Sequence, residues 1–343
     1  MRHEFVRTGK RLGKGWTGLV VLLLAAMLLV AGCGNSGNGG DASASASPSA
    51  TPAGSPAATS PDAGSATSTE TVYPLTLTDA TGTEVTFEKA PERVVSLAPS
   101  ETEILFAVGA GDLVVGVDEY SDYPEEAKSK PKVGDYITNI EAVLAAEPDV
   151  VFAGVSLNEQ AIQELRNLRV TVFAGEANTI DKVIERVETV ALILNKQEQG
   201  KQVTDRMRAE RQKVVDALKD VPKKRVYFEL DPNWTVGDGE FVSELLDLAG
   251  ATNVASGKKG WFEIDPEAII EADPEVILYS VYEGMEPLGD IIKSRPGWDA
   301  ITAIKNGQVY GIDANLTTRN GPRVTQGLME MAKAIHPEIV IEP

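Results

Sequence analysis

The stretch Ile140–Phe152, IEAVLAAEPDVVF, recurs 126 residues later as Pro266–Leu278, PEAIIEADPEVIL. Each copy reads as a short helix that is stopped by an acid–proline pair and followed by a run of Val, Ile and Leu. Proline clashes with the preceding turn and pushes the residue before it out of the helical region, so each helix must end there. The apolar run is typical of a parallel strand covered on both faces. The chain therefore predicts the same helix–strand unit twice.

A second pair of segments repeats in the same order. Arg93–Leu97, RVVSL, precedes a predicted helix that ends at 108–111, and Arg225–Glu229, RVYFE, precedes one that ends at 248–251. Glycine after the last apolar turn is a common helix stop. Strands that alternate with helices indicate parallel βα units. Two matches in the same order predict two related α/β lobes of Rossmann-like type.

Two predicted helices separate the halves. The segment 181–194 places apolar side chains at helical spacing. The segment 197–218 is highly charged and carries only a thin apolar stripe, and a helix of that length spans about 33 Å. A long and mostly polar helix is typical of a bridge along one side of two lobes. Gly200 is unfavourable inside a helix and weakens the prediction of where this one begins.

The N-terminus has the layout of a secretory signal: a basic start, an apolar middle and small residues before Cys33, the single cysteine of the chain. Small residues immediately before a cysteine resemble the lipobox of bacterial lipoproteins, in which the cysteine carries the lipid. The apolar stretch, about 16 residues, is marginal for a membrane span of about 20. We therefore expect a lipoprotein signal peptide at 1–32 and lipidation of Cys33.

The next segment, 33–72, is almost entirely Gly, Ala, Ser, Thr and Pro. It has too little apolar surface to form a core, and we expect a disordered tether. Residues 1–32 hold five of the 32 basic and one of the 51 acidic side chains, so the remaining chain carries 27 and 50, a formal charge of −23. That charge argues against nucleic acid or anionic lipid as partners.

Taken together, the chain resembles the substrate-binding proteins of ABC importers for iron siderophores and cobalamin. The most telling match is Tyr120–Pro124, YSDYP, which is similar to a segment of the cobalamin-binding members. Other family-like segments are PERVVSL (91–97), PGW (296–298), GPRV (321–324) and AIHPE (334–338). The resemblance implies an N-terminal lobe at 73–180, a helical connection at 181–222 and a C-terminal lobe at 223–343, with a ligand cleft between lobes that move little.

The resemblance gives the duplicated Glu141 and Glu267 a role in docking. In the family, a glutamate at this position of each lobe pairs with arginines of the two permease subunits. A two-fold partner presents two equivalent basic pockets, and such charge complementarity sets register more than affinity. Each glutamate can also favour the N-terminal end of its own helix through the dipole. The implied partners are a permease dimer and its cytoplasmic ATPase, and we expect a monomer.

Aromatic side chains are expected to mark the cleft, because large ligands bury flat surface against rings. The resemblance places four candidate ligand contacts there: Tyr120, Tyr136, Trp261 and Arg319. Trp234 and Tyr282 are two further candidates, because each follows a predicted strand of the second lobe. We expect Trp234 in a loop after the first strand of the second lobe. Three further residues are expected to be structural: Trp298 in a turn, His336 at a helix end and Asp122 as a turn cap.

Enzymatic classes are disfavoured by composition. After residue 32 the chain holds one histidine and one cysteine, which leaves no Ser-His or Cys-His nucleophile and too few ligands for zinc or manganese capture. We therefore expect no catalytic residue, no metal site and no cofactor. Haem held by an axial histidine is also disfavoured, whereas a tyrosine ligand to haem stays open.

The transported ligand is chosen by charge. A ferric catecholate siderophore is strongly anionic and favours a cluster of basic residues, but only Arg319 among the candidates is basic. Cobalamin is large, carries little net charge and suits tyrosine and tryptophan. Ferric hydroxamates are closer to neutral and stay open. We therefore expect a protein lipid-anchored to the outer face of the cell membrane that captures a corrinoid, or alternatively a hydroxamate-type ferric siderophore. The long tether suggests a Gram-positive surface.

Overall fold

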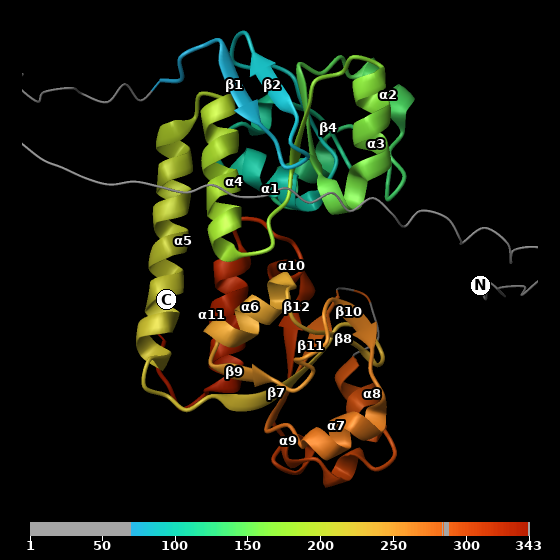
Figure 1. Cartoon of the computed structure of the whole chain (residues 1–343), viewed down its shortest axis with the longest axis vertical. Helices are drawn as coiled ribbons and strands as arrows, with labels where there is room; N and C mark the ends of the chain where they lie inside the picture. The colour runs from blue at the N-terminus through green and yellow to red at the C-terminus, as the bar shows by residue number, and fades with distance from the viewer. Residues whose placement is uncertain (1–69, 283, 285–287, 342–343) are drawn as a thin grey trace, which may run out of the picture. The chain divides into compact units, whose positions relative to one another are not determined.

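The computed structural model describes residues 70–282, 284 and 288–341 (Figure 1). The predicted signal peptide at 1–32, Cys33 and the tether as far as residue 69 lie outside the described residues. Within the described ranges, none of the helices combines the length and the hydropathy that a bilayer crossing requires.

The N-terminal lobe is built on a parallel sheet of four strands in the order β4-β3-β5-β6. These strands are β3 (Val94–Ser96), β4 (Val114–Val117), β5 (Val150–Gly154) and β6 (Val172–Gly175). The helices that follow or precede them are α1 (Pro99–Ala107), α2 (Ile140–Ala145) and α3 (Val155–Asn167). An antiparallel hairpin of β1 (Leu75–Thr78) and β2 (Glu84–Phe87) precedes the sheet.

The C-terminal lobe repeats this topology with the order β9-β7-β11-β12, again all parallel. Its strands are β7 (Lys224–Glu229), β9 (Ala251–Asn253), β11 (Val276–Val281) and β12 (Val309–Asp313). Its helices are α6 (Phe241–Leu248), α7 (Pro266–Ala272), α8 (Leu288–Ser294), α9 (Thr302–Lys305), α10 (Ala314–Thr317) and α11 (Val324–Ile335). A two-stranded ribbon adds β8 (Trp234–Val236) and β10 (Trp261–Glu263). The prediction of two related α/β lobes is confirmed.

The repeat extends to single residues at the helix stops. Glu147 and Asp273, the acids of the two acid–proline pairs, both adopt left-handed backbone, with φ of 46° and 44°. Arg93 Nε donates to the carbonyl of Glu147 at 2.9 Å, and Arg225 Nε donates to that of Asp273 at 3.1 Å. Each lobe therefore ends α2 or α7 with the same proline stop and the same arginine on the freed carbonyl.

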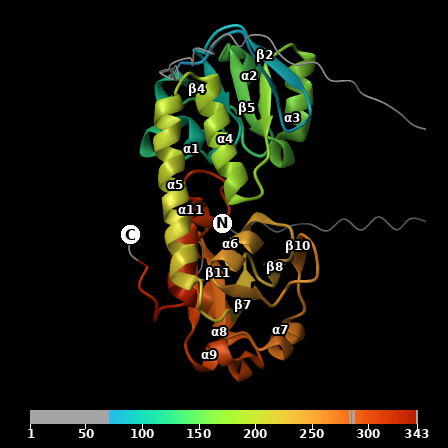
Figure 2. The same cartoon turned by 60° about the vertical axis from the view of Figure 1, so that its left-hand side comes forward.

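Two consecutive helices join the lobes, α4 (Ile180–Ile193) and α5 (Gln197–Leu218). Helix α5 has the predicted bounds, and its buried side includes the four residues of the predicted apolar stripe, Val203, Met207, Val214 and Leu218. Figures 1 and 2 show α5 running alongside both lobes, where it packs on α1 of one and α11 of the other. The long polar helix is therefore a bridge, as predicted.

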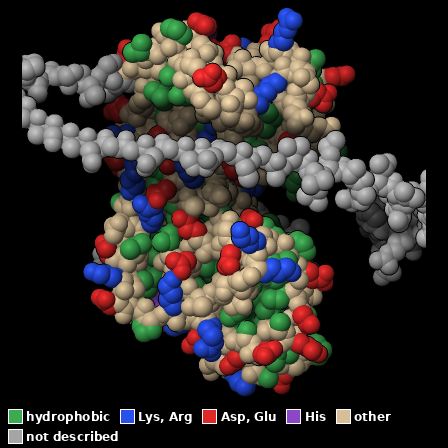
Figure 3. All heavy atoms as spheres, viewed as in Figure 1, with side chains coloured by type: hydrophobic (Ala, Val, Ile, Leu, Met, Phe, Trp, Pro, Cys, Tyr) green, Lys and Arg blue, Asp and Glu red, His purple; other side chains and the backbone are tan. Residues whose placement is uncertain are grey.

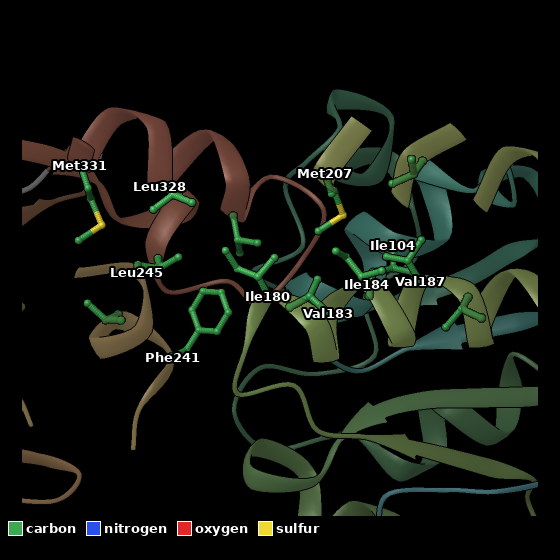
Figure 4. Close-up of a cluster of buried hydrophobic side chains, with 14 of the residues drawn as sticks. Ile104, Ile180, Val183, Ile184, Val187, Met207, Phe241, Leu245, Leu328 and Met331 are labelled. Atoms are coloured by element: carbon green, nitrogen blue, oxygen red, sulfur yellow. The ribbon is translucent and has the colours of Figure 1, made fainter. Parts of the chain in front are cut away.

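One hydrophobic core runs through both lobes. It is formed where α1, α4, α5, α6 and α11 meet (Figure 4). The labelled members are Ile104, Ile180, Val183, Ile184, Val187, Met207, Phe241, Leu245, Leu328 and Met331. Two smaller cores cover the outer face of each sheet. The shared core therefore packs the two lobes directly against each other at a close-packed interface.

Candidate functional site

Two tyrosines of the N-terminal lobe lie against each other. The ring centroids of Tyr120 and Tyr136 are 4.6 Å apart with an interplanar angle of 39°, and the two residues are 42% and 77% exposed. Hydrogen bonds stabilise the loop that carries Tyr120. The backbone N–H of Tyr120 donates to Asp118 Oδ1 at 2.9 Å. Lys132 Nζ also donates to the carbonyls of Asp118 and Ser121. The N-terminal lobe therefore presents a pair of contacting tyrosine rings, tilted to each other, of which Tyr120 lies on a hydrogen-bonded loop.

The turn that carries Tyr136 depends on a glycine. Gly134 has a φ of 118°, and a Cβ there would lie 2.5 Å from the carbonyl oxygen of Ile137. Asp135 Oδ1 closes the turn by accepting from the N–H of Ile137 at 2.8 Å. A cavity of about 120 Å³ borders this turn and is lined by Tyr136, Ile137 and Leu157 among others. The folded-back backbone therefore presents Tyr136 at the surface, where its ring contacts that of Tyr120.

The C-terminal lobe contributes Tyr282, which follows β11 and is 36% exposed. Burial raises the pKa of the Tyr282 phenol, and the nearby Asp231 and Tyr136 raise it further, whereas a hydrogen bond with Thr318 lowers it. Thr318 is next in the chain to Arg319, whose Nη2 lies 3.4 Å from the carbonyl of Tyr120 in the other lobe. Tyrosines of both lobes therefore gather in one region.

The two candidate tryptophans lie on one ribbon. In the β8–β10 register, Trp234 is opposite Glu263 and Trp261 is opposite Val236, so both rings project from the same face. Trp234 is 40% exposed, while Trp261 is half-buried and packs edge-to-face on Phe228 at 6.4 Å. The expectation that Trp234 lies in a loop was wrong, because the residue begins a strand that pairs with β10. Trp234 N–H donates to the carbonyl of Asp231, which connects the ribbon to the surroundings of Tyr282.

Arg319 lies near the tyrosines but is not free. Its Nη1 is 2.6 Å from Asp122 Oδ1 and 3.5 Å from Glu103 Oε1, and its Nη2 lies 3.4 Å from the carbonyl of Tyr120. The expectation that Asp122 caps a turn was wrong, because Asp118 does so and Asp122 pairs with the other lobe. Sequence reasoning missed Glu103. The available signal was an acid directly before the apolar run Ile104–Ala107, since buried carboxylates require a partner.

The two other residues expected to be structural are structural. Trp298 is buried and packs edge-to-face on Tyr227 at 5.9 Å. His336 follows the last residue of α11, is fully buried, and its Nε2 lies 3.1 Å from the carbonyl of Gly250. Neither belongs to the region of the candidate contacts.

Glu141 and Glu267 occupy the same position in the repeat, as the second residues of α2 and α7. Both are exposed, and among the described residues neither carboxylate has a hydrogen-bond or ion-pair partner. The N-caps are Asn139, which accepts from Ala142 N–H, and Asp265, which accepts from Glu267 N–H. Because these N-caps already accept helix N–H groups, the two glutamates are available to a partner.

The surface and the chemistry of the described residues point to binding. On the face shown in Figure 3, basic and acidic side chains are interspersed over both lobes. Within residues 70–282, 284 and 288–341, no group of three His, Cys, Asp or Glu side chains is arranged to hold a metal ion. The distinctive feature is therefore the set of exposed and half-exposed aromatic rings.

Comparison with known proteins assigns this arrangement to a family. A family model described as periplasmic binding protein matches residues 94–316. The chain is 32% identical over 331 residues to an uncharacterized ABC transporter substrate-binding lipoprotein of Bacillus subtilis, covering 94% of this chain and 97% of that protein.

Solved structures have the same fold. The periplasmic vitamin B12 binding protein of Vibrio cholerae matches with a TM-score of 0.65 at 27% identity, covering 72% of this chain and 97% of that one. A periplasmic heme-binding protein from Roseiflexus sp. RS-1 matches with a TM-score of 0.65 at 26% identity, covering 72% and 98%. The chain therefore belongs to the periplasmic binding protein family and is a substrate-binding protein of an ABC importer rather than an enzyme.

Proposed function

We propose that this substrate-binding protein captures a corrinoid on its aromatic side chains and delivers it to the permease of its importer. We call Tyr120, Tyr136, Trp234, Trp261 and Tyr282 the aromatic site. The observation that carries the proposal is the combination of these rings, drawn from both lobes, with an arginine whose charge is already neutralised. Flat, weakly charged ligands gain most from such a surface, because ring burial contributes without desolvating an unpaired charge.

The likeness to a vitamin B12 binding protein supports the corrinoid, whereas the likeness to a heme-binding protein shows that this fold accepts more than one large ring system. The ion pairing of Arg319 therefore does more to select the ligand than the likeness to either protein does. The shared core between the lobes favours capture on a preformed surface, with little closure of one lobe on the other.

Delivery is proposed to use the two exposed glutamates, one in each lobe. Glu141 and Glu267 lie at equivalent positions of a duplicated fold, which suits a permease with two equivalent basic pockets. A lipid on Cys33 is proposed to tether the protein to the outer face of the membrane, and the long segment 33–72 is proposed to give it reach. The protein is proposed to act as a monomer.

The proposal is tested by titrating the soluble chain, residues 34–343, with cyanocobalamin and following tryptophan fluorescence, with calorimetry as a second readout. We expect saturable one-to-one binding that is weakened about two- to tenfold by Tyr136→Ala, since contact with one aromatic ring contributes about 0.5–1.5 kcal/mol beyond the buried area. Leu168→Ala is the matched control, because Leu168 is also an exposed apolar residue of the N-terminal lobe, at 50%. Equal losses in the two variants would contradict a specific role for Tyr136.

A ferric hydroxamate siderophore is the second candidate. It is close to neutral, so the pairing of Arg319 with Asp122 and Glu103 favours it over catecholates as strongly as it favours a corrinoid. Binding of a ferric trihydroxamate by the folded protein, without binding of cyanocobalamin, would transfer the proposal to this ligand. Binding of haem alone, with a tyrosinate-to-iron absorption band that is lost in Tyr136→Phe, would replace both.

A further inference from the structure

Four charged side chains join the two lobes beside the aromatic site. Glu103 of α1 and Asp122 of the loop after β4 come from the N-terminal lobe, and Arg319 and Arg323 come from the segment before α11. Arg323 holds Glu103 through two hydrogen bonds, of 2.9 Å from Nε and 2.6 Å from Nη2. Arg319 holds Asp122 at 2.6 Å. We call these four residues the charge cluster, and its formal charge is zero.

The two arginines are not equivalent. Arg323 is committed to Glu103, whose side chain is only 2% exposed, and its guanidinium also lies 3.8 Å from the centroid of the Tyr123 ring. Arg319 is 3.5 Å from Glu103 and depends on Asp122 for its short contact. Asp122 therefore neutralises Arg319, while Glu103 neutralises Arg323.

The Arg319–Asp122 pair is also the part of the cluster that a ligand can reach. Asp122 keeps 49% of its side chain exposed, and Arg319 keeps 15%. Arg319 Nη2 lies 3.4 Å from the carbonyl of Tyr120, the residue whose ring stacks on Tyr136. A ligand on these tyrosines would therefore sit beside a guanidinium that already has an anion.

We propose that Asp122 is a specificity-determining residue: by holding the Arg319 guanidinium in an ion pair across the lobes, it excludes anionic ligands from the aromatic site. This inference rests on the proposed binding of ligand at that site. An anionic ligand approaching Arg319 meets the carboxylate of Asp122 first, and like charges at an interface oppose the wrong partner. A neutral ligand meets a cluster without net charge and is not repelled.

The Asp122→Asn variant removes the repelling charge and the short ion pair of Arg319. Arg319 then keeps only the longer contact of 3.5 Å with Glu103, which Arg323 already holds. A guanidinium that has lost its short carboxylate contact can form strong, charge-assisted hydrogen bonds with anionic oxygens of a ligand. The probe is the ferric complex of a hexadentate tris(catecholamide), which is a trianion at neutral pH, titrated against residues 34–343 by fluorescence quenching. We expect Asp122→Asn to bind this probe at least about tenfold more tightly than wild type, and the gain to shrink as salt rises.

Asp135→Asn is the matched control. Asp135 is an exposed aspartate in the turn beside Tyr136, and the asparagine keeps the Oδ1 acceptor for Ile137 N–H. It removes the same unit of charge near the same tyrosines without touching Arg319. We expect it to leave the affinity for the trianion within about twofold of wild type, and we expect Arg319→Gln in the Asp122→Asn background to abolish the gain.

Equal affinities of wild type and Asp122→Asn for the trianion would overturn the inference. So would a gain in affinity for Asp135→Asn as large as that for Asp122→Asn, because the gain would then reflect net charge alone. Circular dichroism melts verify that each variant is folded. Cyanocobalamin titrations separate this inference from the proposed ligand. A gain for the trianion that depends on Asp122, in a protein that never binds cyanocobalamin, would keep the selectivity role and reject the corrinoid.

Discussion

Replacing Gly200 of α5 by alanine tests how closely the two connecting helices pack. In an exposed helix position this change stabilises by about 1 kcal/mol, because glycine has the larger conformational entropy to lose. Gly200 is buried, however, and an added Cβ would lie less than 3 Å from the Cβ of Ala191 in α4. Ordinary carbon–carbon contacts are about 3.5–4.0 Å, so α4 and α5 would have to separate by about 1 Å or more.

Overpacking of a closely packed interface costs about 1–3 kcal/mol, which exceeds the gain in helix propensity. We therefore expect Gly200→Ala to lower the free energy of unfolding by about 1–2 kcal/mol, or the melting temperature by about 2–6 °C for a body of this size. Ligand affinity should fall as well, because α5 packs on both lobes.

The assay is urea unfolding followed by circular dichroism, with calorimetric melting as the second measurement. The matched variant is Ala191→Gly, which opens space opposite Gly200. In the double variant we expect a favourable interaction energy of about 1–2 kcal/mol. A Gly200→Ala protein that unfolds at higher urea than wild type would refute the reasoning, because propensity would then outweigh packing. So would strict additivity in the double variant.

Two further predictions concern docking and pH. Glu141→Ala combined with Glu267→Ala should stop uptake into cells while the affinity for ligand stays within about twofold. The control is Glu84→Ala combined with Asp220→Ala, which removes the same charge from other exposed positions. Loss of ligand binding in the first double variant would place Glu141 and Glu267 in the binding site instead. Asp79, at the β1–β2 turn, accepts several hydrogen bonds and forms an ion pair with Arg166. Burial raises the pKa of the Asp79 carboxyl, but hydrogen bonds from Thr81 and from backbone N–H groups outweigh burial and hold this pKa below its ordinary value. A lowered pKa in the folded state adds stability at neutral pH, and this stability is lost as the pH falls through that pKa. Asp79→Asn should therefore lower the free energy of unfolding by about 1–3 kcal/mol at pH 7, and the difference in urea midpoint between the variant and wild type should shrink below about pH 4. A difference that stays constant from pH 7 to pH 3 would contradict this.

The repeated segments explain why the two-lobe architecture could be predicted from the amino-acid sequence. The acid–proline stops at Glu147 and Asp273 end their helices through local sterics, because a following proline disfavours the right-handed helical region. The left-handed backbone at both residues is a finding of the structure. The bridging helix was equally readable, since both its length and its thin apolar stripe are properties of a single segment. Gly200 alone weakened the prediction of where this helix begins. A glycine is needed there because the backbone of α5 lies close to Ala191 of a different helix, α4.

The candidate site was predictable by residue but not by arrangement. The resemblance named Arg319, and the structure adds that Asp122 and Glu103 already pair with it. Both partners are about 200 residues away from Arg319 in the chain, and no local sequence pattern predicts a contact between segments that far apart. Trp234 was assigned to a loop because its partner strand, β10, lies well downstream.

The amino-acid sequence by itself determined the duplicated α/β units, the helix stops and the polar bridging helix, because proline sterics, hydrophobic periodicity and glycine stops act over a few residues. The tertiary structure alone decided that one hydrophobic core runs through both lobes and that Arg319 and Arg323 beside the aromatic site are paired with carboxylates. Packing and ion pairing act through space between segments that the chain order separates, so their outcome exists only once the two lobes have met.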